Sequence, residues 1–152
     1  MSEHEIIILP RDPQWVPDAA VVAAAEPFMA GLFPDAEYVH VTCSEQVHYY
    51  DCGGNFEHIH CPACHTEISV PQWHALMDAD YDPEHNSFAM QNQALPCCGK
   101  MANLNQLQYA FEQGFARFAI SMDNSVGAVE QAIKAEIEEF LGGQPIKIIY
   151  RH

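Results

Sequence analysis

The sequence predicts an α+β fold, and three observations lead to this prediction. Residues 1–55 have the pattern of a strand, a helix and further strand, and residues 101–152 that of helix, strand, helix and strand. Between them, residues 56–100 carry two tight cysteine clusters that interrupt the pattern. Two flanks that share one sheet, with helices on one face, form a ferredoxin-like or related α/β sandwich. We therefore expect a sandwich domain made of 1–55 and 101–152, with 56–100 inserted as a module.

The first flank starts with a strand and a helix. Residues 6–9 form an apolar run closed by Pro10, which is typical of a short buried strand. Asp18 stands where a helix N-cap is expected, directly before the Ala- and Val-rich segment 19–26. Pro27 should end or kink this helix, because proline lacks the amide hydrogen that a helix interior uses. The alternative is that residues 28–33 continue it as another turn, which Pro34 stops.

The rest of this flank and the insert contain short elements. Pro71 fits the first position of a helix over 72–79, and the polar segment 80–87 is expected to be a loop. Segments rich in Tyr, Val, Ile and Thr, bounded by turn residues, predict strands over 37–42, 46–51, 56–60, 66–70 and 88–95.

The second flank is expected to alternate helix and strand. Asn103 or Asn105 can cap a helix that Gly114 ends. The remaining expected elements are an alternating strand over 115–122, an amphipathic helix capped by Ser125 and ended at Gly142, and a last strand over 146–150.

The chain is strongly acidic, with six Lys and Arg against 21 Asp and Glu and a formal net charge of −15. Such a chain repels phosphate backbones and anionic lipid, so we expect neither nucleic acid nor membrane as a partner. It has no apolar run long enough to span a membrane and no basic signal-peptide start, which favours a cytoplasmic location. The charge favours a basic protein partner, although an acidic surface also serves solubility alone.

Four cysteines carry the strongest signal in the sequence. They lie in a Cys-Pro-Ala-Cys turn at 61–64 and a Leu-Pro-Cys-Cys-Gly-Lys turn at 95–100. Thiolates at the tips of two turns can converge on one tetrahedral zinc ion, and a closed four-ligand site of this kind is structural. Leu95 stands where a regular second Cys-x-x-Cys turn would have its first cysteine. The predicted zinc ligands are Cys61, Cys64, Cys97 and Cys98.

Two questions about ligands stay open from the sequence. A histidine can replace Cys97 or Cys98 in the set, and histidines lie nearby at positions 58, 60, 65, 74 and 85. The other two cysteines, Cys43 and Cys52, are expected to be buried free thiols. The alternative for this pair is a second metal site with His40, His48 or Asp51.

Three catalytic patterns are missing or displaced. A thioredoxin-like site needs a helix after the first cysteine, where a turn and a strand are expected here. A zinc deaminase needs His-x-Glu before its Pro-Cys-x-x-Cys, whereas His-Thr-Glu at 65–67 follows the Cys-x-x-Cys. Gly99-Lys100 lacks the preceding glycine and following hydroxyl of a nucleotide-binding loop.

The turns at 61–64 and 95–99, together with Gly-Phe-Ala-Arg-Phe at 114–118, resemble the motifs of an uncharacterised family of small bacterial zinc-ribbon-containing proteins. Some members carry the label sugar-transporter ATPase, which the missing nucleotide loop does not support. The likeness covers roughly 56–150, and His65 departs from the glycine usual after the first turn. The resemblance implies a shared fold and metal site and adds no chemistry.

Two classes of function follow. The first is a non-enzymatic, zinc-stabilised protein-binding domain that engages a basic partner, such as an immunity-type or other inhibitor or adaptor protein. The second is a metal-dependent or His/Asp-based enzyme with its site between the sandwich and the insert, using side chains from 40–85. A metal with an exchangeable water favours the enzyme, and a fully sulfur-ligated metal favours the binding domain. The partner, the substrate and the oligomeric state stay open.

Overall fold

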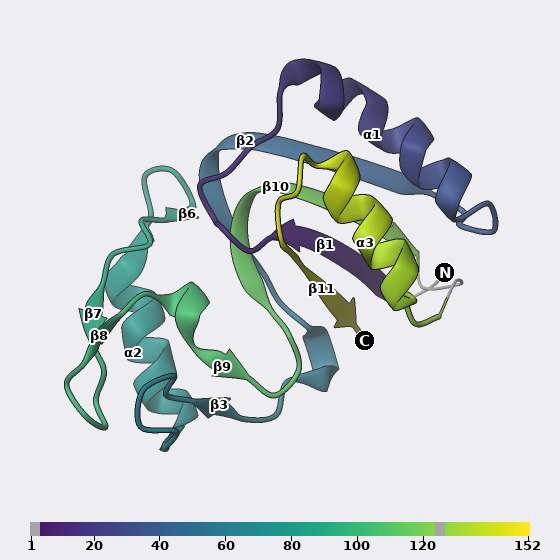
Figure 1. The fold of residues 1–152 in the computed structure, drawn as a ribbon. Helices are drawn as coiled ribbons and strands as arrows, with labels where there is room; N and C mark the ends of the chain where they lie inside the picture. Colours follow the sequence, from purple (N-terminus) through teal and green to yellow (C-terminus); the bar gives the residue numbers. More distant parts are fainter. Residues whose placement is uncertain (1–3, 124–126) are drawn as a thin grey trace.

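A computed structural model describes residues 4–123 and 127–152 and confirms the α+β class, with a four-stranded antiparallel sheet as its framework. The strands lie in the order β11-β1-β10-β2, and each neighbouring pair is antiparallel (Figure 1). Their bounds are β1 Glu5–Pro10, β2 Val39–Tyr50, β10 Gly114–Asp123 and β11 Ile146–Arg151.

Two helices cover one face of this sheet (Figure 1). They are α1 (Ala19–Leu32), between β1 and β2, and α3 (Gln131–Phe140), between β10 and β11. Met29 of α1 and Ile137 of α3 are fully buried against strand residues such as Ile8 and Phe118. The two strand-helix-strand halves, β1-α1-β2 and β10-α3-β11, therefore interleave their strands in one sheet over a shared core.

The other face of the sheet has a smaller core. Ile7, Leu9 and Ile149 point to this side and are almost fully buried. Cys52 and Phe56, from the segment that follows β2, cover them. This segment is the start of the long excursion between β2 and β10, so the excursion is packed against the sheet from its first residues.

The excursion forms a second unit with its own apolar core. The core includes Cys61, Trp73, Leu95 and Tyr109, and it takes in Phe115 from the start of β10. Its elements are the 3-10 turn η1 Gly53–Asn55, β3 Ile59–His60, β4 Glu67–Ile68, α2 Val70–Asp80, β5 Tyr81–Asp82, β6 Ser87–Phe88, β7 Gln93–Ala94, β8 Met101–Ala102, the 3-10 turn η2 Leu104–Gln106 and β9 Gln108–Tyr109.

The two strands predicted over 37–42 and 46–51 are one continuous strand, β2. A bulge interrupts its pairing at the point where the sequence pattern breaks. Cys43 pairs with Phe118 and His48 with Ala116, so four residues of β2 face one residue of β10. That residue is Arg117, whose Nε donates to the carbonyl of Ser44 at 3.0 Å and fills the irregularity.

The helix predicted from Asn103 or Asn105 to Gly114 is wrong. Asn103 does cap a turn, since its side chain accepts from the amide of Asn105 at 3.0 Å, but the turn is the three-residue η2. The chain then extends into β9, where Tyr109 pairs with Ile59. Pairing with β3 buries the Tyr109 ring in the module core, and this packing overrides the local helical pattern.

The structure also places the boundaries of the two sandwich helices. α1 continues through Pro27 to Leu32, because Ala25 and Met29 on either side of the proline are anchored in the core. The described part of α3 has Glu130 as its N-cap, and the expected cap Ser125 lies outside the described residues. Among those residues, no helix is both long and apolar enough to cross a membrane.

Candidate metal centre

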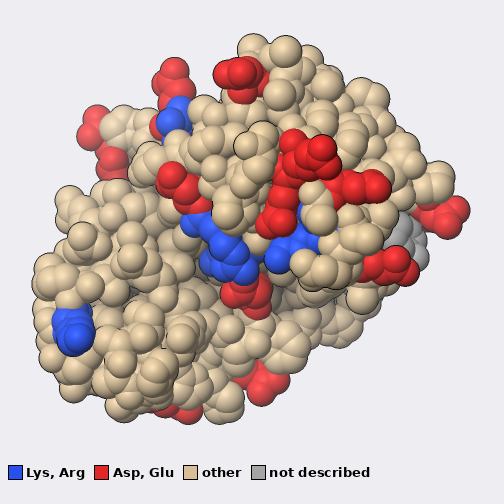
Figure 2. All heavy atoms as spheres, in the orientation of Figure 1, with Lys and Arg blue, Asp and Glu red and all other residues tan. Residues whose placement is uncertain are grey.

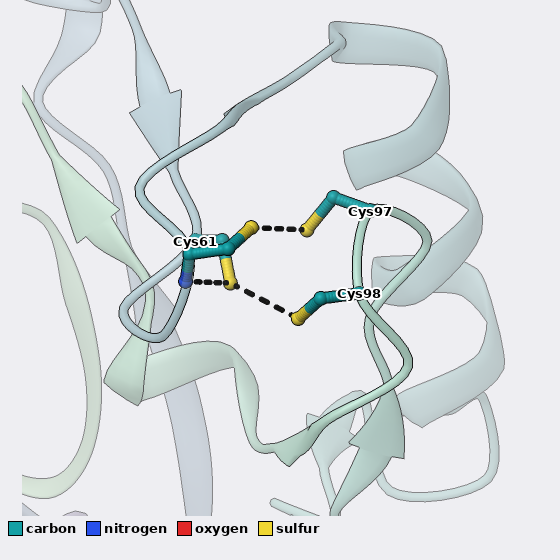
Figure 3. Close-up of side chains that lie close together, drawn as sticks. Cys61, Cys97 and Cys98 are labelled. Carbon is teal, nitrogen blue, oxygen red and sulfur yellow. Dashed lines mark hydrogen bonds between the residues drawn. The ribbon is translucent and has the colours of Figure 1, made fainter.

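The four predicted cysteines meet at one point of the module. The Sγ atoms of Cys61, Cys64, Cys97 and Cys98 all lie within 4.8 Å of one another. Cys61 Sγ is 3.7 Å from Cys98 Sγ, and Cys64 Sγ is 3.4 Å from Cys97 Sγ. Figure 3 shows the Cys61 side chain facing those of Cys97 and Cys98 across the gap between the two turns.

The first turn connects β3 to β4, and its backbone is tightly fixed. The amide of Cys61 donates to the carbonyl of Thr66 at 2.9 Å, and the amide of His65 donates back to the carbonyl of Cys61 at 3.0 Å. His65 adopts a φ of 62°, the left-handed region that closes the turn. The amides of Ala63 and Cys64 then point at Cys61 Sγ, at 3.3 and 3.4 Å.

The second turn, between β7 and β8, repeats this backbone pattern. The amide of Leu95 donates to the carbonyl of Lys100 at 2.9 Å, and the amide of Gly99 donates to the carbonyl of Leu95 at 2.8 Å. Gly99, with a φ of 76°, takes the place that His65 has in the first turn. By these matched bonds, Leu95 occupies the position of Cys61, and both side chains are buried in the module core.

The extra thiol of the second turn compensates for Leu95. Cys98 matches Cys64 by position, while Cys97 stands one residue earlier, where the first turn has Ala63. The site therefore receives two thiols from each turn, although only the first turn has the regular Cys-x-x-Cys spacing. Cys61 is buried, whereas Cys64, Cys97 and Cys98 are exposed, so the cluster lies at the surface of the module.

The local electrostatics act in opposite directions on three of the thiols. Hydrogen bonds from the amides of Cys64 and Ala63 lower the pKa of Cys61. The hydrogen bond with the Thr66 hydroxyl, together with the Thr66 backbone, lowers the pKa of Cys64 to about 6. Loss of hydration, and then the neighbouring sulfurs, raise the pKa of Cys97 to about 12. A bound cation would favour the thiolate at all of these positions, because it opposes their mutual repulsion.

The geometry of the cluster fits a tetrahedral metal ion. Zinc–sulfur bonds of about 2.3 Å place tetrahedral sulfurs about 3.8 Å apart. The two closest pairs, at 3.7 and 3.4 Å, are near this value. Four soft sulfur donors suit metals such as zinc, and a complete set of four protein donors leaves no position for a reacting water. The cluster is thus able to hold a metal ion of this class.

The nearby histidines have other contacts. His58 pairs with Glu67 at 3.2 Å, and His65 Nδ1 lies 3.3 Å from Gln108 Oε1. In the described part of the chain, no histidine belongs to the four-thiol group. The exposed group formed by Asp82, Glu84 and His85 is held together by contacts within its own hairpin, including a 2.7 Å contact between His85 and Asp82.

The remaining two cysteines lie apart from the centre. Cys52 is buried beneath the sheet, as expected, and burial raises the pKa of its thiol. Cys43 is exposed, contrary to expectation, because it stands next to the β2 bulge on an edge strand. Within residues 4–123 and 127–152, neither thiol joins a group of three or more metal-binding side chains.

A second candidate site lies where the sequence predicts a cleft between the sandwich and the insert. A cavity of about 350 Å³ there is lined by Asp51 and His74, which belong to the predicted 40–85 set, and by Gln113, which does not. Gln113 is only 1% exposed. Sequence reasoning missed it because it directly precedes a turn glycine in a segment expected to be helical.

Comparisons with known proteins do not identify the chain. No protein-family model matches it, and neither the curated proteins nor the solved structures contain a match.

Proposed function

We propose that this chain is a non-enzymatic, zinc-stabilised protein-binding domain. The sandwich would be of the ferredoxin-like type, with the excursion between β2 and β10 as a zinc-ribbon-like insert. The proposal depends chiefly on one observation, a hollowed surface beside α3 that is lined by aromatic side chains and rimmed by carboxylates. The four-thiol centre supports the zinc assignment through its donor type and its near-tetrahedral sulfur spacing.

Zinc would act as a crosslink between the two turns. It would join a β3–β4 hairpin to a β7–β8 hairpin that contain only two residues per strand. Such short hairpins are marginal alone, and a structural metal is one of the usual ways to hold them. This role requires no chemical step at the metal.

The surface charge of the protein remains largely unneutralised. Arg151 pairs with Glu5 at 2.8 Å and with Asp51 at 3.1 Å, and Arg11 pairs with Glu112 at 3.3 Å. Lys147 is buried, and Arg117 donates to backbone carbonyls. Four of the six cations are thus occupied within the fold. Asp80 and Asp123 are buried, but most of the 21 carboxylates remain to make the surface acidic.

Carboxylates gather where the surface is also hollow. Figure 2 shows Asp and Glu side chains clustered over α3. Exposed Glu136 and Glu139 lie beside Phe140, whose ring stacks on Phe28 at 4.1 Å. Cavities of about 380 and 360 Å³ adjoin Phe140, and Glu139 borders both. Trp15 lines the larger of the two.

An apolar centre with a charged rim is the arrangement of a protein-binding surface, in which buried aromatic groups supply affinity and charges select the partner. The complementary partner would present Lys or Arg around an apolar side chain. Neutralisation of a basic toxin, in the manner of immunity proteins, is one concrete form of this function. The resemblance of the cysteine turns to an uncharacterised zinc-ribbon-containing family fits the same proposal and does not narrow it.

The test begins with affinity capture from the source cells at low salt, followed by identification and purification of the captured protein. We expect a protein of net positive charge whose affinity falls steeply with salt. The double variant Glu136→Lys/Glu139→Lys should weaken binding at least about tenfold. The matched control Glu45→Lys/Glu57→Lys changes net charge equally, at exposed positions on β2 and before β3. Recovery of no basic partner, or equal effects of the two variants, would refute the proposal.

A further inference from the structure

The cavity between the sandwich and the module has three large aromatic rings in its wall. It lies where the end of β2 and the η1 turn face α2, and its volume is about 350 Å³. Tyr49 comes from β2, Phe56 follows η1, and Trp73 comes from α2. Their rings are close together, with centroids 5.3 Å apart for Phe56 and Trp73 and 6.1 Å for Tyr49 and Trp73. The volume is at the low end of the range for small-molecule sites.

One buried polar group in this wall lacks a partner. The side-chain carbonyl of Gln113 accepts the hydroxyl of Tyr49, but its Nε2 group makes no hydrogen bond with any residue that the structure describes. Gln113 is almost completely buried, so the cavity that it lines is where a partner for Nε2, water or a ligand, can reach it. Turning the amide over would leave its carbonyl unpaired instead. Buried amides are nearly always hydrogen-bonded, so this unpaired group requires a partner.

Charge at the cavity restricts that partner. Asp51 lines the opening, and its two oxygens are already occupied by Arg151 at 3.1 Å and by the Gly53 amide at 2.9 Å. The carboxylate is therefore fixed in place, in a chain of net charge −15. Arg151 offsets the charge of Asp51 locally, so an anionic ligand is disfavoured chiefly by the net negative charge of the chain.

We propose that this cavity binds a small, uncharged, planar aromatic molecule that carries a hydrogen-bond acceptor such as an amide carbonyl. The ring of the ligand lies against Trp73 and Phe56, where offset or edge contacts between rings are favourable. The acceptor receives the Nε2 hydrogens of Gln113. This site is separate from the acidic surface beside α3 and from the four thiols, so it can be tested independently of the proposed function.

Benzamide and benzoate are suitable probes, because they share one ring and differ in charge. The protein carries Trp15→Phe, so that Trp73 is its single tryptophan emitter. We expect benzamide, titrated to about 20 mM, to give a saturable change in Trp73 fluorescence, in the weak range expected for so small a ligand. Benzoate should bind at least about tenfold more weakly.

Two variants test the role of the amide. Gln113→Met preserves the length of the side chain and removes the donor, and it should weaken benzamide binding at least about tenfold. Gln144→Met, beside α3, is the matched control and should leave binding unchanged. If Gln113→Met does not fold, NMR spectra of the unaltered protein provide the test. Benzamide should shift the side-chain amide signal of Gln113.

The proposal is overturned by any of four results: no saturable response to benzamide, equal binding of benzoate, unchanged binding in folded Gln113→Met, or an unmoved Gln113 amide signal at saturation. Failure here leaves the α3 surface untested, and failure of the basic-partner experiment leaves this cavity untested, so the two outcomes are distinguishable.

Discussion

Removal of one zinc ligand should destabilise the module, and the structure gives a magnitude. The sulfur contacts join positions 33 and 37 residues apart in the chain. In the chain-entropy account, a crosslink that closes a loop of this length contributes about 4 kcal/mol at 25 °C. Cys98→Ser removes one donor at an exposed position, so little packing is lost with it. We expect this variant to lose zinc and to lower the free energy of unfolding by about 4 kcal/mol, about a thousandfold in the equilibrium constant.

The assay combines metal analysis with urea denaturation. Trp73 belongs to the module core and Trp15 packs against the sandwich core, so single-tryptophan variants report on each unit. Cys61→Ser should also lose zinc and should cost more, because Cys61 is buried. Cys43→Ser, at an exposed thiol outside the cluster, is the control and should retain both zinc and stability. Purified protein without bound metal, or a Cys98→Ser variant as stable as the control, would refute the crosslink argument.

Three further outcomes follow from individual contacts. Burial lowers the pKa of Lys147, so the unfolded chain binds this proton more tightly than the folded protein does. The contribution of Lys147 to the free energy of unfolding should therefore rise with pH up to about 10, and in urea denaturation the free energy of unfolding of Lys147→Met should rise less over this range than that of the unaltered protein. The double variant Leu95→Cys/Cys97→Ala should still bind one zinc ion by metal analysis, because Leu95 makes the same backbone hydrogen bonds in its turn as Cys61 makes in the first turn. Loss of the metal would contradict the equivalence of positions 61 and 95. Tyr109→Phe leaves the indole N–H of Trp73 and the carbonyl of Leu104 unpaired, so it should lower the free energy of unfolding in urea by about 1–3 kcal/mol. Tyr81→Phe, which removes an exposed hydroxyl contact, should lower it far less.

The sequence predicts the features that depend on local chemistry. Cysteine spacing was enough to locate four thiols that the fold brings together, and the alternation over 115–122 correctly predicts β10. The α+β class also follows from the order of elements in the two flanks.

Features that depend on distant packing could not be predicted in this way. Tyr109 pairs with Ile59 across fifty positions of sequence, and no local signal distinguishes this strand from a helix. Pro27 is tolerated inside α1 because core contacts hold the helix on both sides of it. Gln113 becomes notable only once the fold places it, buried and half-paired, against the rings of another element.

The antiparallel pair β2 and β10 passes through both units of the molecule. Val47 and Phe115 lie in the module core, while Phe118, three residues further along β10, lies in the sandwich core. No linker therefore separates the two bodies at this point, because both strands continue through the bulge at Arg117. A ligand bound in the cavity between the two bodies would therefore contact side chains, such as that of Tyr49, that stand on the same strands as the sandwich core.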